Sequence, residues 1–123
     1  MGELLDDMLA DPLLGVFDRD DYEFRLFIQD HRQQILNSCT YVTLTPNQQA
    51  KYKYRPRYFL YTNEYPAAGD WIFLWINDLT GPMEFINLSQ VRVPNWSFLE
   101  DLYNLYRNIK SNTDTAKKAL LDE

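Results

Sequence analysis

The chain has 123 residues, of which 46% are hydrophobic and 15% aromatic, so it can form one folded domain and wholesale disorder is excluded. Its 12 basic and 18 acidic side chains give a net charge of −6, which argues against a nucleic-acid partner because such partners require an excess of Lys and Arg. The longest apolar run, Trp71 to Ile76, is far shorter than the roughly 20 residues that cross a membrane. We therefore expect neither a nucleic-acid nor a membrane partner.

The acidic N-terminus lacks the basic segment and apolar stretch of a signal peptide. Cys39 is the only cysteine, so no internal disulfide is possible and a reducing compartment is expected. Residues 2–16 are expected to form a short helix that must dock on something, because its apolar residues recur at helical spacing. Those residues are Leu4, Leu5, Met8 and Leu9.

A second helix is expected over residues 21–37, with Asp20 or Asp21 as its N-cap. Its early alternation of apolar and polar residues would also suit a strand, and the periodicity does not decide between the two. Residues 39–45 are β-branched and alternate between faces, which predicts a strand.

Thr45 and Pro46 have the pattern of an N-cap followed by proline in the first helical turn. The helix that follows spans 46–62, and Pro56 predicts a kink or a break into two short helices near Arg55. Residues 63–68 form a loop in this interpretation.

Asp70 is expected to cap a buried helix over residues 71–78, which is apolar nearly all round. A break at 80–82, irregular chain over 83–88 and a short strand over 90–93 follow. Ser97 and Glu100 match a capping box that opens the last helix, 97–110. Residues 111–123 could extend that helix, bind a partner or fray.

The sequence offers no catalytic, cofactor-binding or metal-binding set of residues. A calcium loop that starts at Asp18 would need Gly and Glu where Glu23 and Gln29 stand. His31 is the only histidine, so a His/Cys zinc site cannot be built. A nucleophilic pair of Cys39 and His31 is conceivable, but it lacks an orienting group, and a lone cysteine in an apolar strand is more often a small buried side chain. The expectation is a protein that is not an enzyme.

Nineteen aromatic side chains are more than a chain of this length can bury completely, and tyrosine is favoured at interfaces. A basic stretch with interleaved aromatic residues, which also includes Arg57, is therefore expected to face an acidic protein partner, and stacking on single-stranded bases is the less favoured reading. The predicted protein-interface residues are Lys51, Tyr52, Lys53, Tyr54, Arg55, Tyr58 and Tyr61, together with Leu4, Leu5 and Met8. The predicted structural core comprises Trp71, Leu74, Trp75, Ile76, Phe85 and Asn77, whose amide is expected to cap the buried helix.

Three sequence elements in fixed order resemble a known family. Leu44 to Pro56 followed by Arg57 to Tyr61 resembles a "KYRYRP–x–x–LS–Y" element, and Gly69 to Leu79 with Pro82, Glu84 and Phe85 resembles an "LW–hydrophobic–LN–x–I–x–x–P–x–x–F" element. Val91 to Pro94 resembles the closing "L–R–I–P". Together they resemble the small baseplate wedge subunits of contractile-tailed bacteriophages, which carry a LysM-like fold. The family's Tyr-Gly pair between the two helices is absent from the loop Asn63 to Gly69.

The resemblance implies an α+β protein with a LysM-like β-α-α-β centre over 39–95, an N-terminal helical arm over 1–38 and a C-terminal helix and tail over 96–123. It implies a structural virion protein, assembled in the host cytoplasm, that clamps neighbouring wedge and tail proteins in a hetero-oligomer and needs no cofactor. Two alternatives stay open: a LysM-type module that binds peptidoglycan, and a small phage inhibitor of a host protein.

Overall fold

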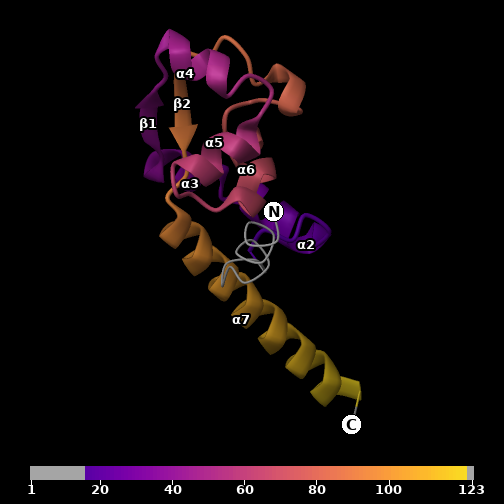
Figure 1. The fold of residues 1–123 in the computed structure, drawn as a ribbon. Helices are drawn as coiled ribbons and strands as arrows, with labels where there is room; N and C mark the ends of the chain where they lie inside the picture. The colour runs from indigo at the N-terminus through magenta and orange to yellow at the C-terminus, as the bar shows by residue number, and fades with distance from the viewer. Residues whose placement is uncertain (1–15, 122–123) are drawn as a thin grey trace.

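A computed structural model describes residues 16–121 as an α+β fold in which helices pack beside a two-stranded antiparallel sheet that lies at the edge of the body (Figure 1). The helices are α2 (Tyr22–Asp30), α3 (Arg32–Ser38), α4 (Pro46–Lys51), α5 (Pro56–Thr62), α6 (Asp70–Ile76) and α7 (Trp96–Leu121). Short 3-10 turns, η1 (Ala67–Gly69) and η2 (Pro82–Glu84), precede α6 and β2. The strands are β1 (Thr40–Thr43) and β2 (Gln90–Val93), paired with Thr40 opposite Val93.

The first described helix begins where its cap was expected. The Asp21 carboxylate accepts a hydrogen bond from the Phe24 backbone N–H at 3.1 Å, which satisfies one free donor of the first turn. The single helix expected over 21–37 is instead two helices, because α2 ends at Asp30 and α3 starts after His31. The His31 Nδ1 lies 2.8 Å from the Phe27 carbonyl, so the imidazole forms a hydrogen bond with a backbone group of α2 close to this break.

The sheet and the helices α4 and α5 follow the sequence expectations closely. The hydroxyl of Thr45 accepts from the Gln48 N–H, and the Gln48 side chain accepts from the Thr45 N–H, which forms a capping box with Pro46 in the first turn. Pro56 begins α5, so the expected break is confirmed. Strand β1 is shorter than the expected 39–45 and mostly exposed, whereas β2 buries Val91 and Val93.

Two expected helix caps are wrong. Gly69, not Asp70, is the N-cap of α6; Asp70 is its first residue, and its carboxylate is paired with Arg19 at 3.0 Å. Helix α7 starts at Trp96, one residue before the expected Ser97, and the Asn95 side chain accepts from the Phe98 N–H at 3.1 Å. Asn is as good an N-cap as Ser, so the local pattern could not choose between adjacent starting points.

Helix α6 joins two hydrophobic clusters. Ile72 and Ile76 pack with α2, α3 and the first half of α7, while Phe73 packs with α5, Phe85 and β2. Residues 16–38 therefore do not form a separate arm: Phe24, Ile28 and Ile35 are fully buried in the first cluster. Beyond Tyr106, α7 runs out from the body as an exposed rod (Figure 1).

Candidate functional site

The predicted interface residues lie where α4 turns into α5. Tyr54 has a backbone φ of +62°, and its N–H donates to the Phe85 carbonyl at 2.8 Å, so the turn is anchored on the second hydrophobic cluster. Pro56 is buried under the turn and fixes the start of α5. Six of the exposed residues around this turn form what we call the basic surface: Lys51, Lys53, Tyr54, Arg55, Tyr58 and Tyr61.

The prediction that Tyr52 faces a protein partner is wrong. Its ring is only 6% exposed and packs against Phe59 with centroids 5.3 Å apart, so it supports the turn from inside instead of facing a partner. Its hydroxyl accepts from the Thr62 hydroxyl at 3.1 Å, and this hydrogen bond, helped by the nearby Lys51 charge, lowers the pKa of Tyr52. In a run where residues alternate between basic and aromatic, the sequence could not reveal which tyrosine points inward.

The basic surface holds its cations over aromatic rings. The Lys51 Nζ lies 5.2 Å from the ring centroid of Tyr52 and 5.9 Å from that of Tyr58, and the Lys53 Nζ lies 5.1 Å from that of Tyr54. Within residues 16–121, none of the ion pairs involves Lys51, Lys53 or Arg55. The surface therefore presents positive charge and exposed tyrosine rings together, the chemistry that suits an acidic protein surface.

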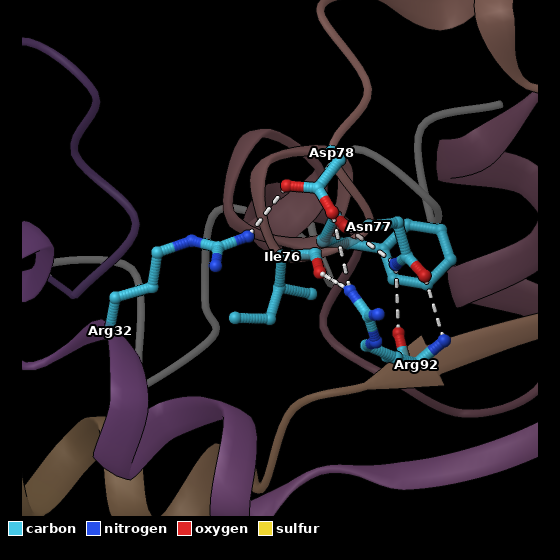
Figure 2. A network of polar contacts seen from close by, with 6 residues as sticks. Arg32, Ile76, Asn77, Asp78 and Arg92 are labelled. Atoms are coloured by element: carbon cyan, nitrogen blue, oxygen red, sulfur yellow. Dashed lines mark hydrogen bonds and ion pairs between the residues drawn. The ribbon is translucent and has the colours of Figure 1, made fainter.

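A separate polar network fastens the end of α6 to β2 (Figure 2). The Asn77 Nδ2 donates to the carbonyls of Phe73, at 2.8 Å, and Arg92, at 2.9 Å, while its Oδ1 accepts from the Arg92 backbone N–H at 2.8 Å. The expected capping role of Asn77 is confirmed, and the bonds to β2 add a second role that the sequence did not reveal.

Charged side chains extend this network to α3. Asp78 accepts from the Arg32 guanidinium at 2.8 Å and lies 3.5 Å from that of Arg92, which also donates to the Ile76 carbonyl at 2.9 Å (Figure 2). Asp78 adopts a positive φ of 60°, a conformation that Asp tolerates better than most residues. The network joins α3, the end of α6 and β2, which are far apart in sequence. The only indication of it in the sequence is the pair of polar residues that directly follow the apolar helix.

The predicted core residues divide into two groups. Ile76, Phe85 and Leu74 are buried, whereas Trp71 and Trp75 are only half-buried. The Trp71 indole N–H donates to the Phe17 carbonyl at 2.9 Å, and Trp75 lies under the Arg32 guanidinium at 5.3 Å.

Both indoles line an open hollow of about 440 Å³ between α2 and α6. The Arg19–Asp70 ion pair and Arg25 also line it. The helix 71–78 is thus less completely buried than its composition predicted, because its tryptophans cover the edge of the core.

Cys39 and His31, the conceivable nucleophilic pair, each form a hydrogen bond with a backbone carbonyl. The Cys39 thiol donates to the Ile35 carbonyl at 3.2 Å, and burial raises its pKa although Arg92 and Arg32 act in the opposite direction. A raised pKa reduces the thiolate that nucleophilic catalysis requires. Among residues 16–121, no cluster of three or more His, Cys, Asp or Glu side chains could hold a metal ion.

The remaining interface candidates, Leu4, Leu5 and Met8, lie outside the described residues. No helix in the described part of the chain is both long and apolar enough to span a bilayer. No protein-family model matches the chain, and searches of curated proteins and of solved structures found no significant match.

Proposed function

We propose that this chain is a structural subunit of a contractile-tail baseplate, a wedge protein that clamps neighbouring tail proteins through its basic surface. Support comes from the order of the elements between the paired strands β1 and β2: if α4 and α5 are counted as one helix broken at Pro56, they and α6 follow the β-α-α-β order of a LysM-like centre. The three elements of the family resemblance lie over residues 44–94, the same part of the chain. We also propose that residues 39–95 form a LysM-like centre.

The observation that carries the proposal is the basic surface itself. Its positive groups have no carboxylate partner among the described ion pairs, and Tyr54, Tyr58 and Tyr61 are about 40% exposed (39%, 40% and 44%). The turn beneath them is held by the Tyr54–Phe85 hydrogen bond and by buried Pro56. Because the turn is anchored, binding a partner does not have to order the backbone beneath this uncompensated patch, which reduces the entropy cost of association.

The test measures how fast added protein is incorporated into sheath-bearing tail particles. The extract comes from cells in which the gene for this chain has been deleted. Lys51→Glu combined with Lys53→Glu is expected to slow incorporation about tenfold or more at low salt, and less at high salt because ions screen the attraction. Arg107→Glu combined with Lys118→Glu is the control, because it changes the net charge equally on the exposed α7. Equal effects of the two double variants would contradict a role for the basic surface.

A further inference from the structure

The outer half of α7 buries none of its residues against the rest of the described chain, and its link to α2 is the ion pair of Lys110 with Glu23 at 3.4 Å. Every residue from Arg107 to Leu121 is exposed, yet all of them are helical. An isolated helix of about 15 residues is marginal in water, because helices in proteins draw most of their stability from a packed face. This half of α7 therefore calls for a partner that covers one side of it (Figure 1).

One face of the outer half is suited to such contact. We call it the α7 seam; its members recur every three or four residues and are Leu105, Ile109, Asn112, Ala116 and Leu120. Leu105, Ile109 and Leu120 are 46%, 49% and 73% exposed. None of the five seam residues is charged, whereas Arg107, Asp114 and Lys118 lie on the opposite side of the helix. An acidic helix would be drawn to the side of Arg107 and Lys118, so the neutral seam points to a neutral partner face.

The α7 seam is complementary to itself when reversed. In an antiparallel pair whose two-fold axis passes between Asn112 and Thr113, the large Ile109 faces the small Ala116 of the other copy, and Leu105 faces Leu120. The two Asn112 side chains then lie on either side of this axis, offset by about 1.5 Å along the helix, where each amide can donate to and accept from the other. A single Asn within an apolar seam fixes the register of a helix pair, because any shift leaves its amide unpaired.

We propose that two copies of this chain associate through their α7 seams as an antiparallel, two-fold symmetric helix pair. The overlap runs from Leu105 to Leu120, about 24 Å of helix at 1.5 Å per residue. A contact of that length is at the small end of specific interfaces, so the association is reversible and depends on concentration. It does not rest on the proposed baseplate function and uses a different surface.

The test is disulfide trapping in full-length protein that carries Cys39→Ser. Leu105→Cys and Leu120→Cys variants, prepared separately and distinguished by isotope labelling, are mixed and oxidised. The proposal predicts a mixed 105–120 disulfide in preference to 105–105 or 120–120, together with a mass near twice the 14.7 kDa of one chain. Circular dichroism before oxidation verifies that each variant is folded.

The matched control is the pair Arg107→Cys and Lys118→Cys. In the proposed helix pair these two positions are level with each other along the axis, but both lie on the side of the helix that faces away from the other copy. The control pair should give little mixed disulfide. Equal trapping of 105–105 and 105–120, equal trapping by the control pair, or the mass of one chain at every concentration of the Cys39→Ser protein up to about 1 mM would overturn the proposal.

Discussion

Asn77 makes to Arg92 the pair of hydrogen bonds that a neighbouring β-strand would make. Its Oδ1 accepts from the Arg92 N–H at 2.8 Å, and its Nδ2 donates to the Arg92 carbonyl at 2.9 Å. In an antiparallel ladder the N–H and C=O of one residue reach the same neighbour, and here a side-chain amide takes the neighbour's place. A two-stranded sheet is marginal by itself, so this link fastens β2 to α6.

Asn77→Ala should lower the free energy of unfolding by about 2–3 kcal/mol, because two backbone groups of half-buried Arg92 lose their partner. Urea denaturation with an unchanged slope would measure the loss. Asn63→Ala is the control, since exposed Asn63 ends α5 as Asn77 ends α6, and its amide donates to the Phe59 carbonyl at 2.8 Å. Similar losses in the two variants would contradict the role of the Arg92 contacts.

Gly69 and Gly81 should respond in opposite ways to alanine. A Cβ at Gly69 would lie 2.8 Å from Trp96 Cζ3 and 3.0 Å from Phe17 Cε1, so Gly69→Ala should cost about 1–3 kcal/mol by displacing the buried Phe17 ring and the half-buried Trp96 ring. A Cβ at Gly81 meets nothing within 4 Å, and the backbone there is extended. Gly81→Ala should leave stability unchanged or raise it by up to about 1 kcal/mol. Thermal unfolding of both variants measures the contrast, and a neutral Gly69→Ala would refute the close packing of Trp96.

The local signals in the sequence predicted what depends on a few adjacent residues. The Asp21 and Thr45 caps and the break at Pro56 all follow from side chains that act within one turn. The Arg19–Asp70 pair could not be predicted, because 51 residues separate its members and no local pattern links them. The same holds for the inward direction of Tyr52 and for the contacts that join Arg32, Asp78 and Arg92, which depend on how helices already formed pack together.

The start of α7 can be tested by removing each candidate cap. Asn95→Ala should destabilise the protein by about 1 kcal/mol, since the Asn95 side chain satisfies the Phe98 N–H. Ser97→Ala should have a smaller effect, because Ser97 is exposed and already within the helix. The reverse ranking in chemical denaturation would show that the helix begins one residue or more later.

Tyr106 should make stability fall at alkaline pH. Burial raises the pKa of Tyr106 above its ordinary 10.0, and the hydrogen bond to Asp21 and the charges of Asp21 and Glu23 raise it further. Above pH 10 the unfolded state loses this proton while the folded state retains it, so stability falls with a slope that approaches about 1.4 kcal/mol per pH unit.

Tyr106→Phe removes this contribution. The variant should be less stable than the parent near neutral pH, because the hydroxyl bond to Asp21 at 3.0 Å is lost, and it should show a flatter decline above pH 10. Denaturation midpoints measured from pH 8 to 11 provide the comparison. Parallel declines in the two proteins would assign the alkaline loss to other groups.

The most direct test of the baseplate proposal is quantitative mass spectrometry of sheath-bearing tail particles purified from cells that express this gene. The account predicts that the chain is present in every preparation at a fixed ratio to the sheath protein and stays bound through gradient sedimentation. Abundant chain in the cell extract with none in the purified particles would contradict it.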